Sequence, residues 1–109
     1  MQSEDSQKIV GRFFDALQML IAAKIIRGKQ TFTREYGINR WNLNTLEGDH
    51  TRDIFQPAWL TYLVRDFHVS PRWLLCGTGE FFDTGWDAAK VKAKQPKIVK
   101  TSDLQAVEK

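Results

Sequence analysis

This chain of 109 residues has one cysteine, three prolines and no long run of apolar residues. Its lone Cys76 excludes an internal disulfide, which is typical of proteins in a reducing cytoplasm. The longest apolar-rich stretch, Ala16 to Ile26, is too short to cross a bilayer, and no basic and apolar leader region is recognisable. We therefore expect a cytoplasmic protein with no membrane partner.

Residues that perform catalysis or hold metals are also scarce. The two histidines, His50 and His68, do not have the spacing of zinc ligands relative to Cys76. The carboxylates form no convergent pair, and Gly77 and Gly79 do not follow a strand, as a phosphate-binding loop requires. We expect no catalytic residue, no metal, no cofactor and no enzyme activity. Because Cys76 follows two leucines, we expect it to be a small buried hydrophobe.

The residues that are present indicate a folded, helical protein. A hydrophobic content of 42% and four tryptophans favour a globule with a modest core, and the length fits one small domain. Apolar residues recur at three-four spacing, which predicts an all-α fold of five helices. The predicted helices are about Ser6 to Ile26, Lys29 to Tyr36, Arg40 to Glu47, Pro57 to Phe67 and Pro71 to Cys76.

The stretch from Gly28 to Gly48 has the most informative pattern, with two short helices meeting at a tight turn. Gly37 is suited to a left-handed helix end, and Asn39 is a strong N-cap for the helix that follows. Leu43 and Leu46, three residues apart, give that second helix one narrow apolar edge. The turn therefore presents the opposite face of the helix to solvent.

The outward face of that helix carries side chains suited to a recognition surface. At about 100° per residue, Trp41, Asn44 and Thr45 point away from the apolar edge, and Arg40 flanks them. Arginine and asparagine can each make paired hydrogen bonds to base edges in the DNA major groove. The alternative for Trp41 is that its ring folds back into the core.

Two segments resemble the helix-turn-helix domain of phage-repressor-type (Xre-like, lambda-repressor-like) regulators. The family pattern of a small residue, a glycine four positions on and an aliphatic pair matches Thr33, Gly37, Leu43 and Leu46, followed by Glu47-Gly48. The family usually has alanine where Thr33 stands. Further on, HVSPRWLLCGTGEFF is similar to the end of the same domain, so that the resemblance covers about residues 12–82.

The resemblance implies a DNA-binding regulator of bacterial or phage origin, most often a repressor, with double-stranded DNA as its partner. The helix Arg40 to Glu47 would enter the major groove, and phosphates would be contacted from the preceding helix and the following loop. The expected base contacts are Arg40, Trp41, Asn44 and Thr45. The expected phosphate contacts are Lys29, Gln30, Arg34, Thr51 and Arg52. If a phage encodes the protein, its location is the host cytoplasm.

The charge distribution agrees with a local DNA-binding surface. The net charge is +3, but residues 1–83 contain as many acidic as basic side chains, so the excess lies after them. Within the window from residue 24 to residue 40, only Glu35 opposes the basic residues. Those basic residues are Lys24, Arg27, Lys29, Arg34 and Arg40.

The sequence changes character at Thr84, where lysines begin to recur with alanine and valine. Pro96 interrupts any amphipathic face. We expect a DNA-binding domain over residues 6–83 and a flexible basic tail over residues 84–109. The tail either contacts phosphates without sequence preference or serves only as a solubilising terminus.

Two alternatives concern partners. The apolar residues near the end of the domain, among them Trp73, Leu74, Phe81 and Phe82, either form a weak homodimer interface or close the monomer's own core. The neutral charge of the domain also favours a second class of function, an antitoxin-like adaptor or protein-interaction module that retains the fold. The surface around Arg40 discriminates between the two functions, because DNA requires a positive face there.

Overall fold

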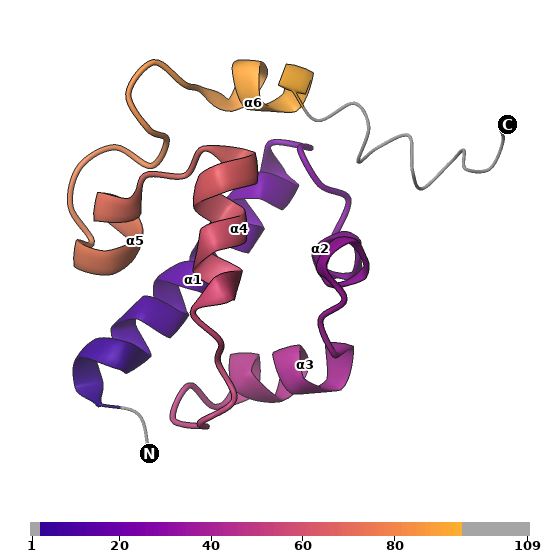
Figure 1. Cartoon of the computed structure of the whole chain (residues 1–109), viewed down its shortest axis with the longest axis vertical. Coiled ribbons are helices and arrows are strands. Elements are labelled where there is room, and N and C mark those ends of the chain that lie inside the picture. Colours follow the sequence, from indigo (N-terminus) through magenta and orange to yellow (C-terminus); the bar gives the residue numbers. More distant parts are fainter. Residues whose placement is uncertain (1–2, 95–109) are drawn as a thin grey trace, which may run out of the picture.

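The computed structural model describes residues 3–94, and within that range every regular element is a helix. The expectation of an all-α protein is confirmed. The helices are α1 (Glu4–Ala22), α2 (Lys29–Tyr36), α3 (Arg40–Gly48), α4 (Ala58–Phe67), α5 (Pro71–Cys76) and α6 (Ala88–Lys94). In Figure 1, α3 lies at one end of the long axis and α6 at the other, with α1 running between them.

Helix α1 begins earlier and ends earlier than the sequence pattern predicts. Ser3 is the N-cap, and its hydroxyl accepts a hydrogen bond from the Ser6 N–H at 3.1 Å. At the other end, Lys24 adopts a left-handed conformation with φ 62°. Ile25 nevertheless stays buried because its N–H donates to the Leu20 carbonyl at 2.9 Å. Apolar residues after the end of α1 are therefore buried by a turn and not by a continuation of the helix.

Phe13 lies at the centre of the core. Its ring contacts those of Phe32 on α2, Phe55 in the loop before α4, and Trp59 on α4, at centroid distances of 5.4–5.8 Å. The pairs with Phe32 and Phe55 are edge-on, a geometry that contributes packing energy beyond the area buried. Trp59 is 4% exposed, whereas its neighbour Leu60 is only half-buried. One aromatic ring of α1 thus contacts both α2 and the chain around the start of α4.

A backbone bridge and one arginine hold α5 in place. Residues Val69 and Phe82 form an isolated antiparallel bridge, beside which the Ser70 N–H donates to the Phe81 carbonyl at 2.8 Å. Arg12 of α1 reaches the C-terminal end of α5, donating from Nε to the Leu74 carbonyl at 2.7 Å and from Nη2 to that of Leu75 at 2.9 Å. These bonds satisfy carbonyls that the end of a helix leaves without partners.

Two expectations about this part of the chain are wrong. Cys76 is an exposed free thiol rather than a buried hydrophobe, because it is the last residue of α5 and points outward just before the left-handed Gly77. Residues 84–94 are not a flexible tail, since they include α6. Its single buried residue, Val91, is 0% exposed, and the Asp87 carboxylate accepts from the Lys90 N–H at 2.9 Å. Residues 95–109 of the expected tail lie outside the described range.

The same C-terminal part is fastened by a stacked ring pair. Trp86, just before α6, lies parallel to His68 at a centroid distance of 3.6 Å. A single valine in an alanine- and lysine-rich stretch has too weak a pattern to predict a packed helix, which explains why the sequence does not reveal α6. No helix within residues 3–94 has both the length and the apolar character needed to cross a bilayer.

Candidate nucleic-acid interface

Helices α2 and α3 are joined by residues 37–39 through two well-formed ends. Gly37 has φ 65°, a left-handed conformation that costs glycine little, and it ends α2 with its N–H bonded to the Thr33 carbonyl. Asn39 begins α3, its side-chain oxygen accepting from the Asn42 N–H at 3.0 Å. Both end signals read from the sequence are confirmed. Figure 1 shows α2 end-on while α3 runs across the view, so the two axes differ greatly in direction.

Helix α2 is packed on one side only. Phe32 is 1% exposed and Thr33 3% exposed, whereas Gln30 and Arg34 face solvent. The buried Thr33 hydroxyl donates to the Gln30 carbonyl at 3.1 Å, so no unsatisfied polar group is buried there. A threonine at this position is therefore accommodated within the packed side of α2.

Helix α3 has the two faces that the sequence predicts. Leu43 and Leu46 are both 0% exposed and attach the helix to the core. On the opposite side the Trp41 side chain is 68% exposed, so the alternative in which it folds into the core is wrong. Arg40 and Asn44 are exposed, whereas Thr45 is half-buried. Of the four residues expected to contact bases, three are thus exposed.

The five residues expected to contact phosphates fall into two groups. Gln30 and Arg34 are exposed on α2, and Arg52 is exposed in the loop after α3. Lys29 instead forms an ion pair with Glu47 that links the start of α2 to the end of α3. The Thr51 hydroxyl donates to the Asp49 carboxylate at 2.6 Å. Lys29 and Thr51 therefore already have acidic partners within the protein.

Asp49 gives the C-terminal end of α3 an acidic character that sequence reasoning missed. Hydrogen bonds from the Thr51 hydroxyl and N–H hold the pKa of Asp49 below its usual value, so this exposed carboxylate is ionised at neutral pH. A carboxylate repels phosphates. The short spacing from Asp49 to Thr51 is the signal that could have revealed this turn. The part of α3 best suited to DNA is consequently its N-terminal half.

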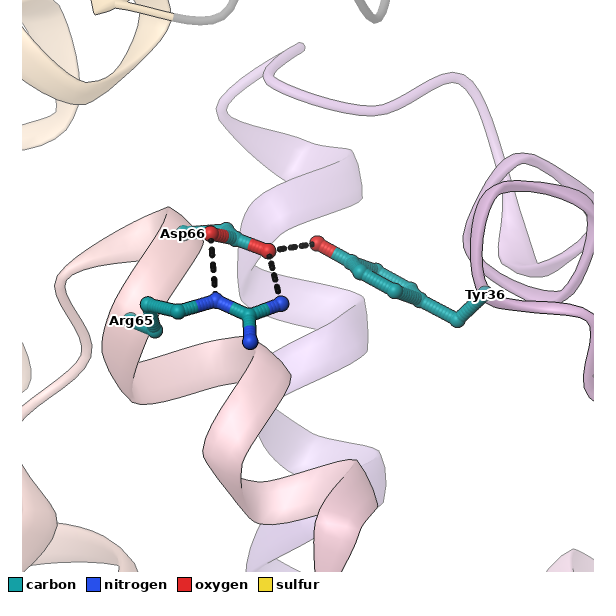
Figure 2. A network of polar contacts seen from close by, with 3 residues as sticks. All are labelled: Tyr36, Arg65 and Asp66. Carbon is teal, nitrogen blue, oxygen red and sulfur yellow. Dashed lines mark hydrogen bonds and ion pairs between the residues drawn. The ribbon is translucent and has the colours of Figure 1, made fainter.

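A polar and aromatic network fixes α2 against α4 (Figure 2). The Tyr36 hydroxyl donates to the Asp66 carboxylate at 2.6 Å, and Arg65 donates to both oxygens of the same carboxylate at 2.9 Å. The Tyr36 ring also stacks on Tyr62 at a centroid distance of 4.1 Å. Burial and the hydrogen bond to Asp66 raise the pKa of Tyr36, so its hydroxyl remains a donor at physiological pH.

This network orients the interface without belonging to it. Tyr36 is the last residue of α2, immediately before Gly37 and the turn into α3. Fixing Tyr36 on α4 therefore fixes the point from which α3 starts. The sequence gives no signal for the pairing of Tyr36 with Asp66, because the two residues are far apart along the chain and both types are common on surfaces.

The expected dimer residues are used within the monomer. Leu74 is 1% exposed, and the half-buried Phe81 ring contacts those of Trp73 and Phe82, each at 4.8 Å between centroids. The exposed apolar residue in this region is Leu75, with an exposed fraction of 51%. It borders a shallow groove between α4 and α5 of about 350 Å³. The groove is lined by Pro57, Leu60, Thr61, Val64, Arg65, Pro71, Leu74 and Leu75.

The two histidines have structural roles in packing. His50 stacks on Phe14 at 5.7 Å between ring centroids, and His68 stacks on Trp86. Within residues 3–94, no three histidine, cysteine or carboxylate side chains are grouped closely enough to hold a metal ion.

Comparison with known proteins does not assign this chain to a family. No family model matches it, and neither the curated proteins nor the solved structures contain a match.

Proposed function

We propose that this protein is a sequence-specific DNA-binding regulator of the phage-repressor type, in which α3 enters the major groove. One observation supports this proposal above all others. The buried side chains of α3 are Leu43 and Leu46, and the helix presents Arg40, Trp41 and Asn44 to solvent on its other side. Because only one narrow side of the helix is buried, the opposite side is free to enter the DNA major groove, which is wide enough for an α-helix.

The exposed side chains have complementary roles in this proposal. Arg40, in the first turn of α3, can donate two hydrogen bonds to a guanine edge, and Asn44, one turn later, can pair with an adenine. Gln30 and Arg34 of α2 would hold the helix in register on the phosphates. Lys29 contributes less than the sequence implies, because its ammonium group is paired with Glu47.

The test compares variants of the two kinds of residue. Alanine at Arg40 or Asn44 should reduce affinity for the preferred site by about 1–3 kcal/mol, with little change on random duplex DNA. Alanine at Arg34 should lower both affinities together, because phosphates carry no sequence information. The preferred site would come from selection among random duplexes, and affinities would be measured on both DNAs at two salt concentrations.

Two matched controls separate recognition from general effects. Asn42→Ala removes an asparagine from the same helix but away from its outward line, and Arg72→Ala removes an exposed arginine from α5. Both should bind the preferred site as the parent does. Melting curves should show that each exposed substitution changes stability by less than about 0.5 kcal/mol. Normally folded Arg40 and Asn44 variants that bind every duplex like the parent would contradict the proposal.

A weak homodimer is the assembly we propose for DNA binding, with two copies reading half-sites about one helical turn apart. The groove beside Leu75, rather than the packed Trp73, Phe81 and Phe82 rings, offers the free apolar surface. Sedimentation at high concentration, with and without DNA, tests the assembly. A strict monomer under both conditions would exclude it.

A protein-interaction module is the second candidate function, and the same groove favours it. An apolar depression next to an exposed leucine is a common feature of protein-binding surfaces. On this alternative Leu75→Ala would abolish partner binding, while the Arg40 and Asn44 variants would have no effect on any DNA.

A further inference from the structure

Trp41 differs from the other tryptophans of the protein. Trp59 is 4% exposed, and Trp73 and Trp86 are half-buried with aromatic partners. Trp41 is 68% exposed, and within residues 3–94 its ring makes no hydrogen bond or aromatic contact. Leaving a ring of this size in water is unfavourable, so such residues commonly mark a surface that a partner covers.

The position of Trp41 on α3 makes it the first group to meet a partner. At about 100° per residue, it points almost directly away from the Leu43 and Leu46 edge, with Asn44 and Thr45 on either side of the same outward line. Gly48, two turns further on, continues that line without a side chain, and nothing surrounds its Cβ position within 4 Å. Gly48 itself therefore places no side chain between α3 and the floor of a groove.

The chemistry of an indole selects among the base edges of the major groove. An indole has an apolar ring and one N–H donor, but no acceptor. Guanine offers acceptors without an apolar group, and adenine and cytosine each present an amino group that needs an acceptor. Thymine alone combines an acceptor, O4, with an apolar group, the 5-methyl. Thymine is thus the base whose edge matches both parts of the Trp41 side chain.

We propose that Trp41 is the residue that specifies a thymine in the DNA site, through contact with the 5-methyl group and O4. This inference rests on the proposed function, because it requires α3 to lie in the major groove. The neighbours of Trp41 favour DNA over a protein partner. Arg40 and Asn44 flank it with the donors and acceptors that base edges require, whereas the groove beside Leu75 has mainly apolar neighbours.

The test changes single atoms of the DNA. In a site selected from random duplexes, each thymine is replaced in turn by uracil, which removes only the methyl group. At one position in each half-site, this replacement should weaken binding about fourfold, the effect expected for losing the burial of one methyl group. A 5-methylcytosine–guanine pair at that position should bind more tightly than an unmethylated cytosine–guanine pair by a similar factor. It should still bind less tightly than the thymine pair, because O4 has been replaced by an amino group.

Protein variants assign the effect to the indole. Trp41→Ala should bind the thymine and uracil sites equally. Trp41→Phe should keep part of the preference for the methyl group, because it retains an aromatic ring but loses the N–H donor. Met19→Ala, which removes an exposed apolar side chain from α1, is the matched control and should discriminate between the two sites as the parent does.

The possible failures are distinguishable. If uracil is tolerated at every position of a selected site, or if Trp41→Ala still prefers thymine, Trp41 does not specify thymine although the protein reads DNA. If Trp41→Ala binds the selected site as tightly as the parent, its ring does not contact the DNA and belongs to a protein-binding surface. If selection yields no preferred site, the proposed function itself is wrong, and this inference with it.

Discussion

Two regions rich in basic residues, one around α3 and one on α6, lie at opposite ends of this molecule (Figure 1). They differ in the side chains that accompany the positive charges. Around α3, Arg40 and Arg34 are accompanied by an exposed tryptophan and asparagine. On α6, Lys90, Lys92 and Lys94 are accompanied by alanines. Lysine ammonium groups attract any polyanion, whereas arginine, asparagine and tryptophan together can distinguish one base from another. Positive charge alone therefore does not identify a recognition surface; its neighbours do.

The same comparison changes the interpretation of the C-terminal lysines. If α3 lies in a DNA groove, α6 is at the far end of the long axis from that duplex. A contact between these lysines and phosphates of the same site is thus disfavoured. Deleting everything after Thr84 would not test this, because the deletion also removes Val91 and Trp86 from their packing. Point substitutions are needed instead.

The largest effect is expected from breaking the attachment of α3. Leu46→Ala should reduce the free energy of unfolding by about 2–5 kcal/mol, because Leu46 is 0% exposed and its truncation leaves a cavity. Urea or thermal unfolding measures the change. Asn44→Ala on the opposite face of the same helix is the control and should be nearly neutral. An equally mild effect of both would mean that α3 is not held by its leucine edge.

A smaller effect is expected from the corresponding substitution at the other end. Val91→Ala removes two buried methyl groups and should cost about 1.5–2 kcal/mol. The variant should keep the affinity of the parent for DNA at temperatures where it is folded. Lost DNA binding in a folded Val91→Ala protein would show that the two ends are coupled.

Tyr36→Phe tests the link that orients α3. The substitution keeps the ring stacked on Tyr62 but removes the hydroxyl that donates to Asp66. We expect a loss of about 1–2 kcal/mol, toward the modest end for a bond to a charged group because Asp66 is partly exposed and retains Arg65. Thr61→Ala, an exposed change on α4, is the control. A stability unchanged by Tyr36→Phe would mean that stacking alone fixes α2.

The smallest effect separates the two basic regions directly. Arg34→Ala should flatten the dependence of log affinity on log salt by about 0.9, the amount expected for one lost phosphate contact. Lys92→Ala removes the same charge from α6 and should leave the salt dependence unchanged. Titrations of one duplex at several salt concentrations measure both slopes. If the two variants had the same salt dependence of DNA affinity, the proposed difference between the basic residues near α3 and those on α6 would be wrong.

The sequence predicted the parts of this structure that depend on local chemistry. The left-handed Gly37, the cap Asn39, and the opposite burial of Leu43 and Trp41 follow from residue type and helix period. Each of these features is decided within a few residues of the chain, so the pattern contains the information.

Features that depend on distant residues escaped prediction. The Lys29–Glu47 ion pair was not anticipated, although it changes the role assigned to Lys29. Val91 is buried because α6 packs against the rest of the folded domain. The exposure of Cys76 depends on how α5 packs against the domain. Local composition predicted a flexible tail from residue 84 and a buried Cys76. Both predictions were wrong, because tertiary packing determines whether these residues are buried.

The two bonds from Arg12 to α5 have a consequence for how this protein can evolve. Both acceptors are main-chain oxygens, those of Leu74 and Leu75, so the anchor does not depend on which side chains those residues carry. Position 75, exposed beside the groove, is therefore free to vary without loosening α5. Substitutions at position 75 can therefore change the surface chemistry beside the groove while the two main-chain bonds to Arg12 are kept.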